Sequence, residues 1–399
     1  MTFGDVVRDV KESERDPLKA GLERYVGLEH LEPFNFEVSE WGLLTEDDVS
    51  FTKRFRAGQV LFGKRRAYQR KVGVADFDGI CSSDILTFEA IEERLLPELL
   101  PFVVQSDPFF EHALDTSSGS LSPRTRWSQL RNFEFQLPDL ATQLRVAELL
   151  VAASEAEARQ RLLLQSLKEY KFSLASHLWK HGTKGERRVA SKIGKVPESW
   201  NVARLKEHTS DSAYGPRFPA SQYAESGNVQ TIRTTDFDRR GGLTLDDVPY
   251  TTLRDEVIEK HQLKVGDFLL SRSGEYAGLT ATFTEADGCF IAAAFCIRFQ
   301  LKPSLLSEYL VHLCYSDFGE RYVMPLATGS AQPNISGTKM LNVLVPVPPI
   351  DEQQIISAIL ADCETSMTVA ESHLETLRNL TMSLTNSFMR GELRLEVFV

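Results

Sequence analysis

The sequence predicts an α+β protein made of two copies of one unit, in which a globular α/β part is followed by a long helix. Two observations carry this prediction. Apolar residues recur at alternating steps of three and four along two stretches of about 40 residues, the spacing of a helix with one apolar face. These stretches, with much of what precedes each, also match one another at a nearly constant offset, which indicates an internal duplication.

The two long helices are expected at 139–182 and 348–391, because no proline or glycine interrupts the first between Asp139 and His181 and the second repeats its design. At about 1.5 Å per residue each would be about 60 Å long and could not bury its apolar face against itself. Each is therefore predicted to pack against the other. The predicted apolar faces are Val146, Leu149, Leu150, Ala153, Leu163, Leu164, Leu167, Tyr170, Leu174 and Leu178, and Ile356, Ile359, Leu360, Cys363, Met367, Ala370, Leu374, Leu377, Leu380, Leu384 and Phe388.

The duplication places Pro138 opposite Pro348 and Gln143 opposite Gln353, both at an offset of 210 residues. Upstream, the turn after the strand at 55–62 matches the one after 263–270 at an offset of 208. Short strands at 132–138 and 342–349 are expected to lead into the helices. The resulting domain prediction is a globular domain at 1–138, a helix at 139–182, a basic linker at 183–195, a globular domain at 196–347, a helix at 348–391 and a tail at 392–399.

Composition describes an ordinary cytoplasmic protein: 399 residues, 42% apolar and 25% charged, with no apolar run long enough to cross a bilayer. The polar first residues do not resemble a signal peptide, and the five cysteines form no CxxC pair, as expected of reduced core thiols. The net charge of −11 conceals two basic clusters. Residues 53–71 carry eight basic side chains and no acid, and 180–195 carry six with one acid, so the chain is able to hold a polyanion locally.

No catalytic signature or metal-ligand spacing was found. The segment GQVLFGK at 58–64 has phosphate-loop spacing, but Arg65 stands where Ser or Thr must contact magnesium. The E-x-K triplet at 169–171 lies on the first long helix, without a partner aspartate on a neighbouring strand. The sequence therefore favours a binding protein with no catalytic residue, no metal ligand and no cofactor of its own.

The combined motifs resemble the specificity subunit of type I restriction–modification systems, across nearly the whole chain. They are a GS-x-x-P loop, a strand ending in LP or VPP, and a glutamine early in a long helix, all present twice. Copy one departs at Arg124 and Thr142, where copy two has Asn334 and Glu352. The residues concerned are Gly119-Ser120, Pro138 and Gln143, then Gly329-Ser330-Ala331-Gln332-Pro333-Asn334, Pro348-Pro349, Glu352-Gln353 and Met389-Arg390-Gly391-Glu392-Leu393, with GLEHLEP at 27–33, VPESW at 196–200 and GDFLLSRSG at 266–274.

This resemblance implies two target-recognition domains, each reading one half of a bipartite site in double-stranded DNA, and two helices paired as an antiparallel coiled coil that set the spacing. It implies two modification subunits docked on the chain, which carry S-adenosylmethionine and methylate adenine. It also implies restriction subunits that cut DNA with ATP and magnesium. Two other classes stay open: an enzyme of unrecognised type, and a coiled-coil scaffold or DNA-binding protein acting outside a restriction complex.

The candidate DNA contacts lie in the basic turns, in the polar loops and on the GS-x-x-P loops. An arginine there is able to fork onto guanine, but the same residues also fit a solvated charged face or, on the GS-x-x-P loops, a turn that only shapes the chain. The predicted contacts are Lys64, Arg65, Arg66, Arg70, Lys71, Arg124 and Arg126 in copy one, and Tyr214, Arg217, Arg233, Arg272, Ser273, Tyr276, Gln332 and Asn334 in copy two.

Overall fold

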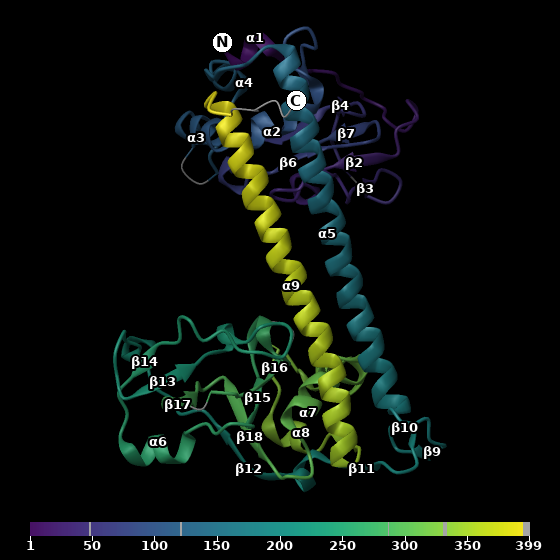
Figure 1. Ribbon diagram of the computed structural model, residues 1–399, viewed down its shortest axis with the longest axis vertical. Coiled ribbons are helices and arrows are strands. Elements are labelled where there is room, and N and C mark those ends of the chain that lie inside the picture. The colour runs from purple at the N-terminus through teal and green to yellow at the C-terminus, as the bar shows by residue number, and fades with distance from the viewer. Residues whose placement is uncertain (48, 120–121, 286, 330–332, 394–399) are drawn as a thin grey trace, which may run out of the picture. The chain divides into compact units, whose positions relative to one another are not determined.

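The computed structural model describes the chain except for residues 48, 120–121, 286, 330–332 and 394–399. It divides into two compact units, each of which is described by itself (Figure 1). Unit 1 is Met1–Leu162 with Glu371–Val399, and unit 2 is Leu163–Ala370. The division runs through the long helices rather than at their starts, because each half of a helix packs into a different unit.

Unit 1 holds two four-stranded sheets. The first has the order β1-β8-β5-β6 and is antiparallel, and the second has the order β3-β2-β7-β4, in which β2 and β7 are parallel. The elements are α1 (Phe3–Val6), β1 (Val7–Asp9), β2 (Arg24–Val26), β3 (Gly42–Leu43), β4 (Lys53–Phe55), β5 (Val60–Gly63), β6 (Val72–Val74), β7 (Gly79–Cys81), β8 (Ile85–Ala90), α2 (Leu100–Gln105), α3 (Asp107–Asp115), α4 (Trp127–Leu130) and the first part of α5 (Leu140–His181).

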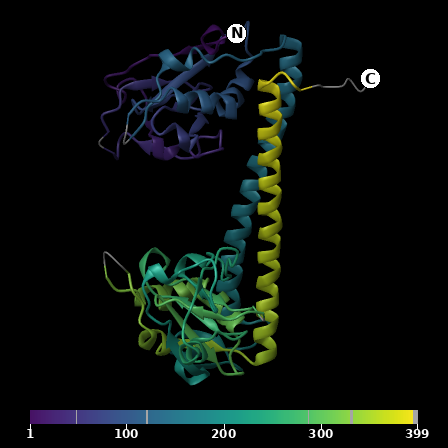
Figure 2. The ribbon, with the colours of Figure 1, turned by 90° about the vertical axis from the view of Figure 1, so that its left-hand side faces the viewer.

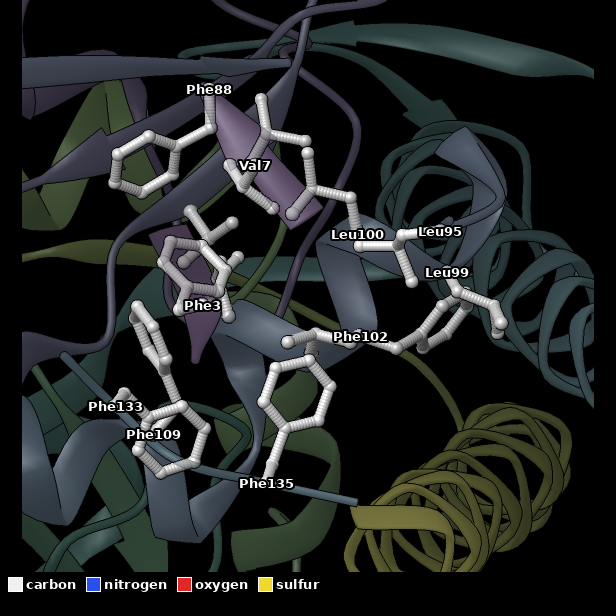
Figure 3. Close-up of a cluster of buried hydrophobic side chains, with 14 of the residues drawn as sticks. Phe3, Val7, Phe88, Leu95, Leu99, Leu100, Phe102, Phe109, Phe133 and Phe135 are labelled. Atoms are coloured by element: carbon white, nitrogen blue, oxygen red, sulfur yellow. The ribbon is translucent and has the colours of Figure 1, made fainter. Parts of the chain in front are cut away.

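The core of unit 1 is rich in phenylalanine and lies between the first sheet, the helices α2 and α3, and the start of α5. Figure 3 shows Phe3, Phe88 and Phe109 pointing toward one another from three separate elements. The Phe3 and Phe88 ring centroids are 5.5 Å apart at an interplanar angle of 81°, an edge-to-face contact that adds to the burial of the rings. This core holds the strand β5 rigidly beneath the basic turn that follows it.

Unit 2 holds an antiparallel sheet of order β12-β18-β15-β16, a three-stranded sheet of order β14-β13-β17 and two further strand pairs, β10-β9 and β11-β19. Its elements are the later part of α5, β9 (Arg188–Ser191), β10 (Gly194–Pro197), β11 (Asn201–Arg204), β12 (Thr209–Tyr214), β13 (Val229–Ile232), β14 (Tyr250–Thr251), α6 (Asp255–His261), β15 (Phe268–Ser271), β16 (Thr280–Thr282), β17 (Phe290–Ala292), β18 (Cys296–Leu301), α7 (Ser307–Cys314), α8 (Gly337–Leu341), β19 (Leu344–Val347) and the first half of α9 (Ile350–Met389).

The two units share one sheet topology, which supports the duplication inferred from sequence. The sheet β1-β8-β5-β6 corresponds strand for strand to β12-β18-β15-β16. The parallel pair β2 and β7, with β3 on its edge, corresponds to the parallel pair β13 and β17, with β14 on its edge. The fold is therefore α+β, with two α/β globular parts each followed by a long helix. None of the described helices is long and apolar enough to cross a membrane.

The long helices pair antiparallel within each unit, as the two views show (Figures 1 and 2). In unit 1 the start of α5, with Val146 and Leu150, shares a core with Phe388 at the end of α9. In unit 2 the later part of α5, with Leu164, packs against Met367 in the first half of α9. In both units, the first half of one long helix packs against the last half of the other, which is the arrangement of an antiparallel coiled coil.

The apolar faces differ from the sequence prediction at several positions. Tyr170 and Leu380 are 58% and 50% exposed, and of each predicted leucine pair only Leu150 and Leu164 are buried. Polar side chains take part in the helix contact instead. In unit 1 Thr381 donates a 2.5 Å hydrogen bond to the carboxylate of the buried Glu157, and in unit 2 the buried Lys171 pairs with Glu364. The spacing of three and four residues therefore predicted which face of each helix contacts the other, but not which side chains make the contact. Buried polar side chains follow the same spacing as apolar ones.

A buried glutamine joins each globular part to its helix. The side chain of Gln143 accepts a hydrogen bond from Leu96 N at 3.1 Å and donates to the carbonyls of Arg94 and Pro138, both at 2.9 Å.

In unit 2 the side chain of Gln353 makes the corresponding contacts, with Leu306 N at 2.8 Å and with the carbonyls of Ser304 and Pro348 at 3.0 and 2.8 Å. Every partner is displaced by the offset of 210 residues, so the sequence match is a structural one.

The strands expected before the helices form only in unit 2. There β19 pairs with β11 over four residues. In unit 1 the segment 132–138 is not a strand, and only Glu134 forms an isolated bridge with Thr2. An apolar alternation forms a strand only where a partner strand runs alongside it, which a local pattern does not reveal.

Replacing Gln353 by alanine is expected to lower the free energy of unfolding of the chain by about 2–3 kcal/mol, because three backbone groups lose their partner in a buried site. Gln354→Ala changes the exposed neighbouring glutamine and is the matched control. Urea denaturation followed by circular dichroism measures both. Equal stability of the two variants would contradict the anchoring role of Gln353.

The buried His312 of α7 predicts a dependence of stability on pH. Burial, followed by the nearby Lys171 ammonium, lowers the pKa of His312 to about 4, and its Nδ1 lies 3.6 Å from the Glu364 carboxylate. The imidazole is then neutral in the folded chain but charged in the unfolded chain below its ordinary pKa of about 6.5, so stability falls as the pH drops from about 7 towards 4.

His312→Phe places the residue found at the matching position of copy one, Phe102, and removes this proton uptake. At pH 5 the native chain is expected to lose about 2 kcal/mol relative to pH 8, a loss that the variant does not share. Denaturation curves at the two pH values test this, and parallel losses in both proteins would show that His312 is not the titrating group.

Candidate nucleic-acid interface

In unit 1 the basic turn that follows β5 lies against residues 122–125. Arg66 N donates to the carbonyl of Pro123 at 2.8 Å, and Thr125 N donates to the carbonyl of Lys64 at 3.0 Å. Arg65 and Arg124 form an isolated antiparallel bridge. Two segments that lie about 60 residues apart in sequence therefore present their side chains together.

Unit 2 repeats this backbone arrangement with different side chains. Gly274 N donates to the carbonyl of Pro333 at 3.1 Å, and Ile335 N donates to the carbonyl of Arg272 at 2.8 Å. Ser273 and Asn334 form the matching bridge. The correspondence between Lys64 and Arg272 proposed from sequence is thus reproduced by the backbone hydrogen bonds.

Asp84, directly before β8, binds two arginines of unit 1. Arg124 binds its carboxylate through both Nε and Nη2, at 2.8 and 3.2 Å, and Arg65 Nη1 lies 3.5 Å away. The hydrogen bond from Arg124 is the main cause that lowers the pKa of Asp84, so the carboxylate stays charged. Two cations share one anion, which leaves the group with net positive charge.

An open hollow lies in front of this cluster. It is lined by Lys64, Arg124 and Arg126, with Ser118, Gly119 and Trp127 also contributing. Arg124 and Arg126 are exposed, and neither Lys64 nor Arg126 has a carboxylate partner within the described part of the chain. A cationic hollow with free N–H donors suits phosphate oxygens and base edges.

The matching surface of unit 2 relies on an amide and aromatic rings. Arg272 Nη2 donates to Asn334 Oδ1 at 3.0 Å, and its guanidinium group lies 4.7 Å from the ring centroid of Tyr214. Phe295, whose carbonyl accepts from Arg272 N, is 61% exposed. Among the described residues Arg272 forms no ion pair with a carboxylate, so its charge is available to a ligand.

Two predicted contacts of unit 1 are engaged within the fold. Arg70 pairs with Asp107 and lies 5.0 Å above the ring of Phe110, and Lys71 Nζ donates to the carbonyl of Leu28 at 2.5 Å. The structure therefore gives both side chains an intramolecular partner. Arg66, by contrast, is exposed beside the hollow at a positive φ of 54°.

In unit 2 the remaining predicted residues are spread more widely. Arg233 is paired with Asp236 through hydrogen bonds of 2.8 to 3.2 Å. Arg217 lines a separate hollow with Lys260 and His261, and Tyr276 ends the short 3₁₀ helix after Ser273. Gln332 lies outside the described residues.

Sequence reasoning missed Asp84 and Phe295. Asp84 directly precedes β8 in unit 1, and Phe295 directly precedes β18 in unit 2. An acid within a polar turn, or a lone aromatic residue there, carries no signal of its own, since its arginine partners are distant in sequence. Within the described chain no cluster of His, Cys, Asp and Glu could hold a metal ion.

Comparison with known proteins agrees with this architecture. Residues 197–378 match the family model of the type I restriction modification DNA specificity domain. The chain is 22% identical to the type I restriction enzyme MjaVIII specificity subunit of Methanocaldococcus jannaschii, over 85% of this chain and 77% of that protein.

Two solved structures share the fold. One, from work on complex assembly and conformational transition of the type I R-M system, has a TM-score of 0.59 at 21% identity and covers 98% of this chain and 97% of that chain. The other, the type I restriction–modification S subunit of M. genitalium, has a TM-score of 0.55 at 11% identity and covers 98% and 95%.

Two globular units with the same sheet topology, the same loop pairing and a long helix each define a duplicated α+β protein. Residues 197–378 match the type I restriction modification DNA specificity domain, and most of the chain is similar to a type I restriction enzyme specificity subunit.

Replacing Lys64 and Arg126 together by alanine is expected to weaken DNA binding and to lower the slope of log affinity against log salt by about two, because each lost phosphate contact removes about one unit. Lys19→Ala, which changes an exposed lysine outside the hollow, is the control. Titration of a DNA duplex at several salt concentrations gives the slopes. An unchanged slope would show that the hollow faces only solvent.

Proposed function

We propose that the chain is the sequence-reading subunit of a type I restriction–modification complex, in which each unit reads one half of a bipartite site in double-stranded DNA. The observation that carries the proposal is the duplicated backbone of the two candidate sites. In both units the turn after the third strand of the sheet pairs with the GS-x-x-P loop through the same hydrogen bonds.

The two units share a backbone arrangement but carry different side chains, as expected of two surfaces that bind different DNA sequences. Unit 1 presents Lys64, Arg124 and Arg126, whereas unit 2 presents Arg272, Asn334 and Tyr214. Arginine and asparagine are the side chains that pair with guanine and adenine edges in the major groove. The proposed site is therefore made of two half-sites with unrelated sequences.

The long helices are proposed to set the gap between the half-sites and to dock the modification subunits. Large apolar side chains remain exposed on both helices, among them Leu144, Leu162, Phe172, Ile355 and Val369. Such side chains on helices otherwise stabilised by their own pairing favour contact with further protein. Two modification subunits fit the two similar units.

The chemistry is proposed to belong to the partner subunits, with this chain acting as a non-catalytic subunit in the cytoplasm. The modification subunits would carry S-adenosylmethionine and methylate adenine, and the restriction subunits would use ATP and magnesium. This chain contributes the choice of DNA sequence, and the partners act where it binds.

The spacing role predicts the effect of inserting four residues into each helix. Insertion between Leu162 and Leu163 and between Ala370 and Glu371 falls at the division between the units and leaves the contacts inside each unit in place. It adds about 6 Å and one turn plus about 40° to each helix. A four-residue insertion largely preserves a pairing based on steps of three and four.

The altered chain is expected to recognise the same two half-sites with a gap longer by one or two base pairs, because DNA rises about 3.4 Å per base pair and completes a turn in about ten. Mapping methylated sites in a genome that expresses each version with the same partner subunits measures the gap. An unchanged gap, or new bases within a half-site, would contradict the spacing role.

A further inference from the structure

Asp84 binds one edge of the Arg124 guanidinium group and leaves another edge free. Arg124 uses Nε and Nη2, one side of its planar guanidinium group, to bind the two carboxylate oxygens of Asp84. Among the described residues, Arg124 Nη1 makes no hydrogen bond. The end formed by Nη1 and the second N–H of Nη2 is therefore available to a ligand with two adjacent acceptors.

Burial orients this free end outward. The Asp84 side chain is 16% exposed and lies beneath an Arg124 side chain that is 48% exposed on the hollow. The backbone of Asp84 is itself held, because Lys64 N donates to the carbonyl of Asp84 at 2.9 Å and Asp84 N donates to Ser82 Oγ at 3.2 Å. The guanidinium group thus has a defined position before any ligand arrives, which reduces the entropy lost on binding.

We propose that Asp84 is a positioning residue that presents Arg124 to a guanine in the half-site read by unit 1. Guanine offers O6 and N7 as adjacent acceptors in the major groove, and the end of a guanidinium group matches them with two parallel hydrogen bonds. This assignment rests on the DNA-reading function proposed above. It adds that the recognised base is guanine, that Arg124 binds it and that Asp84 positions Arg124.

Arg65 has a different part in the cluster. Its Nη1 lies 3.5 Å from Asp84 and its Nη2 donates to Ser122 Oγ at 3.3 Å, so its own end is occupied. Arg65 supplies the second positive charge that keeps the cluster cationic beside the DNA backbone, while Arg124 keeps the free bidentate end.

At the matching position, unit 2 has no carboxylate, so the pairing of a carboxylate with an arginine is particular to unit 1. Phe295 takes the place of Asp84, since its carbonyl accepts from Arg272 N as that of Asp84 accepts from Lys64 N. Arg272 is held by Asn334 and Tyr214 instead of by a carboxylate. A change at Asp84 is therefore expected to alter one half-site and leave the other unchanged.

The test uses the full-length chain and a randomised duplex DNA library, from which bound molecules are selected and sequenced. The wild-type chain is expected to enrich a guanine at one position of one half-site. Asp84→Asn keeps the shape but loses the charged acceptor that orients Arg124, and it is expected to reduce the preference for that guanine about tenfold. The second half-site and the gap should be unchanged, and the salt slope should rise by about one.

Two further variants separate positioning from folding. Arg124→Met keeps a long unbranched side chain but has no N–H donor, and it is expected to lose the same guanine preference without removing a carboxylate. Glu12→Gln is the matched control, because Glu12 binds Arg56 through the same bidentate geometry in unit 1 at 3.0 and 3.2 Å, and neither residue lines the hollow. It should change neither base preference nor salt slope.

The outcomes decide between the two proposals. A guanine preference that survives Arg124→Met, or an Asp84→Asn chain that binds all sequences more weakly by one common factor, would overturn the positioning role while DNA reading stands. A wild-type chain that enriches no sequence at all would instead overturn the DNA-reading function itself.

Discussion

In each unit, the junction between the globular part and its long helix depends on one buried glutamine side chain. Gln143 and Gln353 each bind three backbone groups. Two of them lie between a sheet strand and the next helix, and the third lies just before the long helix. A glutamine side chain offers both donors and an acceptor, so a single residue satisfies all three groups and fixes the direction in which the helix leaves the globular part.

The helix pairing makes each unit depend on distant parts of the chain. Unit 1 is completed by residues 371–399, and its core includes Phe388 and Met389. Unit 2 is built from a continuous segment, but its core contains the last turns of α5 with Leu178 and Trp179. Contacts of such large sequence separation slow folding, since a long loop must close before they contribute.

A common backbone with exchangeable side chains explains how one fold serves two different readers. The loop pairing is made by main-chain hydrogen bonds, which do not depend on the side chains that project from it. Asp84 and Phe295 occupy the same backbone position, and one anchors two arginines whereas the other exposes a ring. Recognition is thus free to change by substitution at a few positions without loss of the fold, because the core below them is separate.

The sequence alone determined the repeated plan: two similar globular parts, two long helices, the offset that relates them and the glutamine at each helix start. These features are periodic or local, so a linear pattern contains them. It also located both basic turns, and it paired the turn at Arg272 with the one at Lys64. The predicted residue contacts remain proposals, and Gln332 lies outside the described residues.

Only the tertiary structure decided which cations have intramolecular partners. Arg70 and Arg124 look alike in sequence, yet Arg70 pairs with Asp107 above a buried ring, whereas Arg124 is held by Asp84 with one edge free. Asp84 precedes Arg124 by 40 residues, and Asp107 follows Arg70 by 37. An ion pair forms wherever the fold brings two charges together, and no local pattern of residues records that distance.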